Sequence, residues 1–357
     1  MPEGGGATPS FLLGGPLIDK YKTPARMRSH WGKKTSHCVV SSRSTHRRSK
    51  MQQLILCVLL ASFWTSCTGA GDWCYQSQFT CDHQCNAPEK WDNAFKECAG
   101  KYQSPINIVT RKTLKDERLT PIQFKNYQQI FRSTIINNGH SVQVGVPHPS
   151  TISGGGLQGI YKAVQFHLHW GSNGGPGSEH TIDGEQYPME LHIVHMNSHY
   201  TDLTTALRDP EGIAVLGFFY EKSNSANRKY EAIINTLRNV KATNGNTSLP
   251  AISLAQLIPS EQNLTSYYRY KGSLTTPGCA EAVVWTVFEK PIPLSMDQLG
   301  AFSELQFHDG KQMMGNFRPV QPLNGRQVFR SGSAIILASS ALLMAAIAMA
   351  LGLSQPN

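Results

Sequence analysis

The strongest constraint on the fold is a series of short segments rich in β-branched and aromatic residues, separated by Gly, Pro and Asn. Such segments with such turn residues predict β-strands. The clearest are 134–136, 141–144, 163–170, 190–195, 213–220 and 282–288. Helical periodicity is sparse, and its best examples are 227–240 and 295–306. The sequence therefore predicts a mainly β protein with a few peripheral helices.

The N-terminal region differs in composition from the rest of the 357-residue chain. From Met51 an apolar run of about a dozen residues follows a basic stretch and leads to small residues near Ala70, which is typical of a secretory signal. We therefore expect a signal peptide over 51–70 and a start of translation at Met51, with 1–50 a non-native or unstructured extension. Residues 71–330 contain no linker or repeat and are expected to form one domain.

The C-terminal region carries no charge after Arg330, and 334–353 is an apolar run long enough to span a bilayer. A retained membrane helix usually has Lys or Arg on its cytoplasmic side, and none follows here. Small residues at 331–333 favour a glycosylphosphatidylinositol (GPI) attachment signal over 331–357, with the lipid on Ser331. This predicts a protein anchored at the extracellular face of the plasma membrane, and a retained helix is the alternative.

The basic excess of the chain is concentrated in its first 50 residues. The chain has 33 Lys and Arg against 24 Asp and Glu, and residues 1–50 hold 10 and 2 of these, which leaves 23 against 22. A nearly neutral mature protein is not expected to bind nucleic acid.

Secretion sets the expected covalent chemistry. Five cysteines lie beyond the signal, and in this compartment disulfides are their default state, with one thiol left over. The sequons at Asn246 and Asn263 predict N-glycosylation. The five cysteines are Cys74, Cys81, Cys85, Cys98 and Cys279.

Three histidines suggest a metal site. His167 and His169 are two residues apart on a predicted strand, so both side chains lie on one face. His192 follows 23 residues after His169 on another predicted strand, which can pair so that His192 faces the first two. Three neutral nitrogen ligands leave zinc a fourth, open position, as in catalytic sites. A His-x-His pair alone also arises by chance or as core packing.

Two further residues support this interpretation. Gln165 and Glu190 each precede a histidine by two residues on the same strand face, where they can accept an imidazole N–H and fix its tautomer. The remaining histidines that we considered are assigned structural or surface roles: His148, His180, His195, His199 and His308.

Several longer runs occur in order between about Trp73 and Arg330: QSPINI (103–108), NNGH (137–140), QFHLHWG (165–171), SEHT (178–181), ELHIVH (190–195), GSLTTP (272–277) and NFRP (316–319). With these runs the chain resembles the animal-type alpha carbonic anhydrases. Its signal, cysteines and tail are most similar to the membrane-anchored type-four branch. The resemblance implies a large twisted, mostly antiparallel sheet with zinc at the bottom of a conical cleft.

The resemblance also implies roles for individual residues. His167, His169 and His192 match the zinc ligands, held by Gln165, Glu190 and the backbone of Asn316. Thr275 matches the threonine that orients the attacking hydroxide and donates to Glu179, and His140 matches the proton shuttle, with Asn138 ordering the connecting water. The carbon dioxide site is matched by Val194, Val215, Leu274, Thr276 and Trp285, although the apolar members by type alone would be core residues.

The implied activity is zinc-dependent, reversible hydration of carbon dioxide to bicarbonate and a proton, with inhibition by sulfonamides. The implied disulfides are Cys74–Cys85 and Cys98–Cys279. Cys81 is then free, paired alternatively with Cys74, or linked to a second chain. The alternatives are a recognition module that has lost a zinc histidine, although all three are present here, and a zinc hydrolase acting on esters.

Overall fold

The structure, a computed structural model, describes residues 73–79, 85–147 and 150–332. The expected extension, the signal peptide, Cys81, His148 and the apolar run 334–353 lie outside these residues. Within the described ranges, no helix is long and apolar enough to cross a membrane.

A mixed sheet of 12 strands forms the centre of the fold, in the order β12-β4-β5-β7-β10-β11-β14-β13-β15-β2, while β6 joins β3 to β7. Most neighbours are antiparallel, and β11 with β14 and β15 with β2 are parallel. The strands are β2 (Leu114–Asp116), β3 (Ile122–Lys125), β4 (Phe131–Asn137), β5 (Val142–Gly145), β6 (Thr151–Gly154), β7 (Tyr161–Trp170), β10 (Met189–Asn197), β11 (Ile213–Ser223), β12 (Asn246–Ile252), β13 (Tyr267–Gly272), β14 (Val283–Ser295) and β15 (Phe329–Ser331). The predicted mainly β fold is confirmed.

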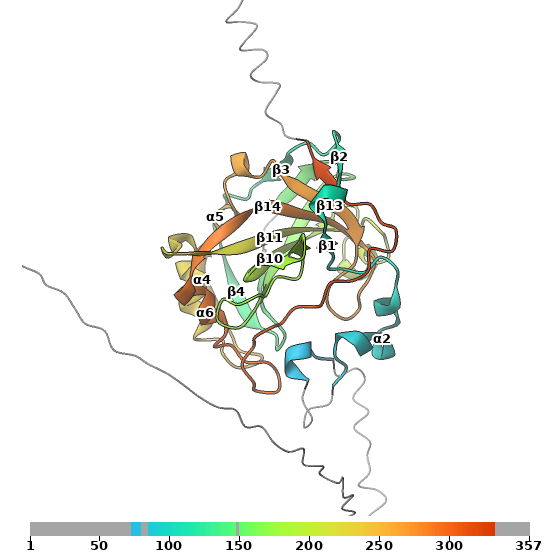
Figure 1. The fold of residues 1–357 in the computed structure, drawn as a ribbon. Helices are drawn as coiled ribbons and strands as arrows, with labels where there is room; N and C mark the ends of the chain where they lie inside the picture. Colours follow the sequence, from blue (N-terminus) through green and yellow to red (C-terminus); the bar gives the residue numbers. More distant parts are fainter. Residues whose placement is uncertain (1–72, 80–84, 148–149, 333–357) are drawn as a thin grey trace, which may run out of the picture. The chain divides into compact units, whose positions relative to one another are not determined.

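Short elements surround this sheet. A second sheet of three strands contains β1 (Asn107–Ile108), β8 (Thr181–Ile182) and β9 (Glu185–Gln186). The α-helices are α2 (Trp91–Ala94), α3 (Leu203–Ala206), α4 (Glu231–Leu237), α5 (Leu254–Leu257) and α6 (Met296–Phe302). The 3-10 helices are Gln76–Gln78, Pro88–Lys90, Lys96–Ala99, Thr110–Lys112, Arg228–Tyr230 and Glu261–Asn263. Figure 1 shows α4 and α6 together beside the long central strands.

All six predicted strands are present, whereas the two predicted helices are shorter than expected. A 3-10 turn capped by Asn227 opens the first, and the helix α4 ends at Leu237. Ser295 caps α6 in a box with Gln298, and this helix ends at Phe302. Both helices lie at the periphery, where only one face packs on the sheet.

The two faces of the central strands differ in what they contact. In β7 and β10, Phe166, Leu168, Leu191 and Ile193 belong to the main core cluster. The alternating positions of these strands carry the three histidines, on the opposite face. Both expected disulfides are present. Cys74–Cys85 joins two segments that lie outside the sheet, and Cys98–Cys279 joins another such segment to the loop after β13.

Candidate metal centre

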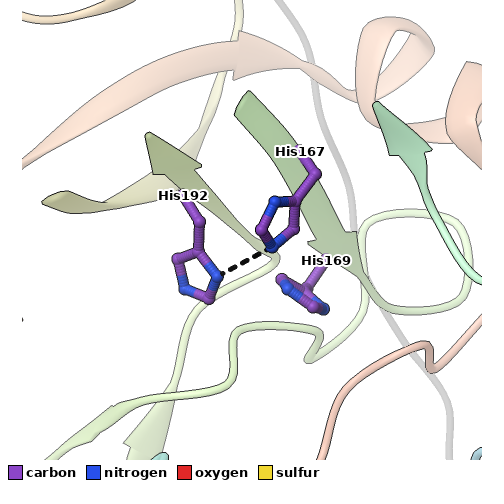
Figure 2. Close-up of side chains that lie close together, drawn as sticks. All are labelled: His167, His169 and His192. Carbon is purple, nitrogen blue, oxygen red and sulfur yellow. Dashed lines mark hydrogen bonds between the residues drawn. The ribbon is translucent and has the colours of Figure 1, made fainter. Parts of the chain in front are cut away.

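The pairing of β7 with β10 brings the three histidines together. His192 lies directly opposite His167 in this antiparallel register. His169 is two residues further along β7, so its side chain projects from the same face. Figure 2 shows the three rings converging between the two strands. One nitrogen from each ring lies within 4.8 Å of the other two.

A different acceptor binds the outer nitrogen of each ring. Nδ1 of His167 lies 2.9 Å from Oε1 of Gln165, and Nδ1 of His169 lies 2.7 Å from the backbone oxygen of Asn316. Nε2 of His192 lies 2.8 Å from Oε1 of Glu190. Because an oxygen without hydrogen only accepts, each of these ring nitrogens must donate. The nitrogens left without hydrogen are Nε2 of His167, Nε2 of His169 and Nδ1 of His192.

These three nitrogens are suited to a cation. Nδ1 of His192 lies 3.3 Å from Nε2 of His167, the contact drawn in Figure 2. Nε2 of His169 is buried and has no hydrogen-bond partner. Facing lone pairs at such distances repel one another unless a positive charge lies among them. A set of three imidazoles is a known catalytic zinc arrangement, so these residues fit zinc.

Burial keeps the ligands in the form that a metal requires. Burial, followed by the neighbouring His169 and His192, lowers the pKa of His167 well below its ordinary value. Burial is also the main reason why the pKa of His169 is lowered. Metal ligands must be neutral imidazoles, so the lowered pKa values favour binding near neutral pH.

Glu190 is held by four hydrogen bonds. Its Oε2 accepts from the backbone N–H groups of Glu179 and His180, at 2.9 and 2.8 Å. Its Oε1 accepts from Nδ1 of His180 at 2.7 Å and Nε2 of His192 at 2.8 Å. Burial alone would raise the pKa of this carboxyl, but its interactions with His180 and His192 outweigh burial and lower the pKa well below the usual range. Glu190 is therefore an oriented, ionised acceptor.

His180 extends this network away from the metal centre. Its Nε2 lies 2.6 Å from the hydroxyl oxygen of Tyr270, and this oxygen lies 2.9 Å from Oγ of Ser104. From the sequence, His180 is expected to be a structural or surface residue, and neither Tyr270 nor Ser104 is expected at the site. The run SEHT was the available signal, because it places His180 next to Glu179.

Glu179 also lies at the histidines. Its Oε1 accepts from the backbone N–H of Arg318 at 2.9 Å, and its Oε2 lies 3.5 Å from Nε2 of His169. Oε2 is buried and has no hydrogen-bond partner, so the expected donation from the Thr275 hydroxyl to this oxygen is not formed. Thr275 is itself buried, in the loop that follows β13.

An apolar surface adjoins the metal centre. Val194, Val215 and Trp285 belong to one buried cluster, and Leu274 packs against it. The ring of Trp285 lies 4.8 Å from that of His192, between centroids. Thr276 is partly exposed, and its backbone oxygen accepts from the N–H of Cys279. Trp285 therefore lies beside a metal ligand, and Val194, Val215 and Leu274 share its apolar environment.

His140 is linked to the centre through Asn316. Its backbone oxygen accepts from Nδ2 of Asn316 at 3.1 Å, and the carbonyl of Asn316 holds His169. The imidazole ring of His140 stacks on Trp73 at 3.8 Å. Asn138 Oδ1 accepts from the backbone N–H of His140 at 3.0 Å, which fixes the turn.

The expected modification sites lie outside the hydrogen-bond network of the metal centre. Asn246 and Asn263 are exposed, at the start of β12 and the end of a 3-10 helix. Ser331 ends β15, where its hydroxyl donates to the backbone oxygen of Thr265 at 2.7 Å.

Comparison with known proteins gives the family. A profile of the eukaryotic-type carbonic anhydrases matches residues 86–332. "Carbonic anhydrase 4" of Rattus norvegicus is 40% identical over 283 residues, which cover 78% of this chain and 91% of that protein. "Carbonic anhydrase 4" of Oryctolagus cuniculus is 41% identical over 265 residues, covering 73% and 85%. "Carbonic anhydrase 12" of Homo sapiens is 38% identical over 274 residues, covering 74% and 76%.

The family match spans the metal centre and the elements that hold it, from β7 and β10 to the loop that carries Asn316. The chain therefore belongs to the eukaryotic-type carbonic anhydrase family and is a carbonic anhydrase enzyme.

Proposed function

We propose that this protein hydrates carbon dioxide reversibly to bicarbonate and a proton, with zinc held by His167, His169 and His192. The observation that carries the proposal is the convergence of three neutral nitrogens, each fixed by an acceptor on the other side of its ring. Bound there, zinc supplies a Lewis acid and a hydroxide nucleophile near neutral pH, as it does in characterised carbonic anhydrases.

The substrate site lies on the apolar surface of Val194, Val215, Leu274 and Trp285, with Thr276 at its polar edge. Carbon dioxide is small and has no net charge, so it needs an apolar surface and no charged clamp. The position of Trp285 against His192 supports this assignment. Inhibition by sulfonamides is part of this proposal, because the family implies it.

Thr275 orients the attacking oxygen, and Glu179 directs the Thr275 hydroxyl. A hydroxyl that accepts a hydrogen bond from the nucleophile must send its own proton elsewhere. The buried Oε2 of Glu179 is an acceptor in need of a donor, which supports this role. In this role, Oγ1 of Thr275 donates a hydrogen bond to Oε2 of Glu179.

His140 transfers the proton from the centre to buffer. Each turnover releases a proton, and an imidazole with an ordinary pKa of about 6.5 can take it up and release it near neutral pH. The hydrogen bond from Asn316 to the backbone of His140 places this residue next to the segment that holds His169, which supports the assignment. Asn138 holds the turn and can order water there.

The protein works at the outer cell surface. Its signal at 51–70 directs the domain 71–330 into the secretory pathway, and the tail 331–357 is replaced by a GPI anchor at Ser331. The two disulfides are consistent with an oxidising compartment. Phosphatidylinositol-specific phospholipase C should release the protein from cells, and retention after release of a control anchored protein would favour a membrane helix.

The decisive test compares carbon dioxide hydration and ester hydrolysis by the protein, with and without a zinc chelator. His192→Ala should lose both hydration and zinc, because two histidines cannot hold a high-affinity site. His199→Ala is the matched control, since His199 makes no contact with the metal centre in the described structure. Near-normal hydration by His192→Ala with zinc retained would exclude the proposed centre.

A further inference from the structure

The sequon at Asn246 lies at one end of a row of side chains that leads to the metal centre. Asn246 is the first residue of β12, the edge strand of the large sheet, and its side chain is exposed. Nδ2, the atom to which a glycan would be attached, donates to the backbone oxygen of Asn244 at 3.2 Å. A substituted amide keeps one hydrogen, so this bond is compatible with attachment.

The register of four strands connects this residue to His167. Asn246 pairs with Ile136, Ile136 with Gln143, and Gln143 with His167. Residues directly opposite on neighbouring strands project from the same face of a sheet. With three strand spacings of about 4.8 Å each, the backbone of Asn246 lies about 14 Å from that of His167.

The face that carries this row is the accessible one. Ile136 is 38% exposed, and Gln143 and His167 are partly exposed. In the next row the side chains project from the opposite face, and Ile135, Val144 and Phe166 are buried in the main core. The side chain of Asn246 therefore stands on the open face that leads to the metal centre.

The segment before Asn246 is also bonded to the turn that carries His140. The backbone N–H of Asn137 donates to the oxygen of Gly245 at 2.9 Å, and that of Asn244 donates to the oxygen of Asn137 at 2.8 Å. Asn137 precedes His140 by three residues. Asn246 is thus close to both the metal-bearing row and the proposed proton route.

We propose that an N-linked glycan on Asn246 stands at the rim of the active-site face and restricts the approach of macromolecules, while small molecules pass. This inference rests on the proposed function, which places the chain in the secretory pathway and the substrate on this face. A glycan is bulky and hydrophilic, so it obstructs partners of its own size and leaves carbon dioxide, bicarbonate and small buffers unhindered. It also covers the polar edge of β12, which would otherwise be available for pairing with another chain.

The test uses the full chain produced in mammalian cells, with Ile136→Cys as a probe placed between Asn246 and Gln143. The labelling rates of this thiol by N-ethylmaleimide and by a 5-kilodalton polyethylene glycol maleimide are compared, and the protein without Ile136→Cys gives the background from other thiols. Asn246→Gln and Ser248→Ala both remove the sequon by different changes. Asn263→Gln removes the other sequon and serves as the matched control.

Mass spectrometry of the glycopeptide should find Asn246 occupied. Both sequon variants should raise the ratio of the large to the small reagent's rate at least about threefold, because steric restriction acts on association rates. The ratio should not change in Asn263→Gln. An unmodified Asn246, or a ratio that is the same with and without the glycan, would overturn the inference. Labelling requires neither zinc nor turnover, so a failed hydration assay with the expected ratios would instead reject the proposed function.

Discussion

Replacing Glu190 by Gln should weaken zinc binding, because it changes the tautomer of His192. The carboxylate accepts four hydrogen bonds, two at each oxygen. A carboxamide has one accepting oxygen and one donating nitrogen. If its nitrogen faced the backbone N–H groups of Glu179 and His180, two buried donors would lose their acceptor at a cost of about 1–3 kcal/mol each. We therefore expect the oxygen on that side and the nitrogen facing the two imidazoles.

That orientation changes the tautomer of His192. Its Nε2 must now accept, so its proton moves to Nδ1, the nitrogen that faces His167 and His169. Zinc then binds only after this proton is displaced. Loss of such an outer hydrogen bond lowers metal affinity about 10- to 100-fold, a general range that includes carbonic anhydrases, which corresponds to about 1.4–2.8 kcal/mol.

The assay is competition for zinc between the protein and a chelator of known affinity. Nitrogen NMR of the metal-free variant should find the proton of His192 on Nδ1, and urea unfolding monitors the fold. Glu185→Gln, at an exposed carboxylate in β9, is the matched control. A dissociation constant within a factor of two of the wild-type value, or an unchanged tautomer, would refute the reasoning.

Three further predictions concern other residues. Burial lowers the pKa of His195 from 6.5 to about 4. Between these pH values the imidazole is protonated in the unfolded chain but not in the folded protein. The free energy of unfolding is therefore highest above pH 6.5 and falls by about 3 kcal/mol by pH 4. The difference in the free energy of unfolding between the wild type and His195→Gln, measured with urea, should shrink by about 3 kcal/mol over this range. A difference that stays constant with pH would contradict the prediction. The double variant Cys98→Ala with Cys279→Ala opens a loop of 181 residues and should lower the free energy of unfolding by up to about 5 kcal/mol; a loss below about 1 kcal/mol is incompatible with that account. His140→Ala should lower kcat about tenfold or more in dilute buffer, leave kcat/KM nearly intact and recover with imidazole, and absence of rescue would remove the shuttle role.

The sequence alone determined those relations in the metal centre that hold between residues of the same strand. Two residues of separation on a strand place His167 and His169 on one face, and the same spacing places Gln165 and Glu190 within reach of the rings that follow them. These relations depend only on backbone alternation. The six clearest strands were predictable for a similar reason, because their β-branched and aromatic residues fit a pleated, half-buried surface.

Some strands and helix ends could not be predicted from local composition. β13 has three tyrosines, which favour a strand, but it also contains Arg269, Lys271 and Gly272, and β12 contains Pro250, so neither was among the clearest strands in the sequence. β13 is central and its Arg269 is nevertheless buried, because its guanidinium finds Thr286 and the backbone oxygen of Gly155. Tertiary partners therefore decided these elements.

Tertiary structure also completed the site. The carbonyl of Asn316 reaches His169 from 147 residues away, and the chain from His180 through Tyr270 to Ser104 crosses three separate segments. Strand register decided that His192 faces His167 and that Asn246 shares their accessible face. A register is fixed by burying one whole face of each strand against the core, and a shift by one residue would reverse every side chain. That condition involves the packed sheet as a whole, so no local stretch of sequence contains it.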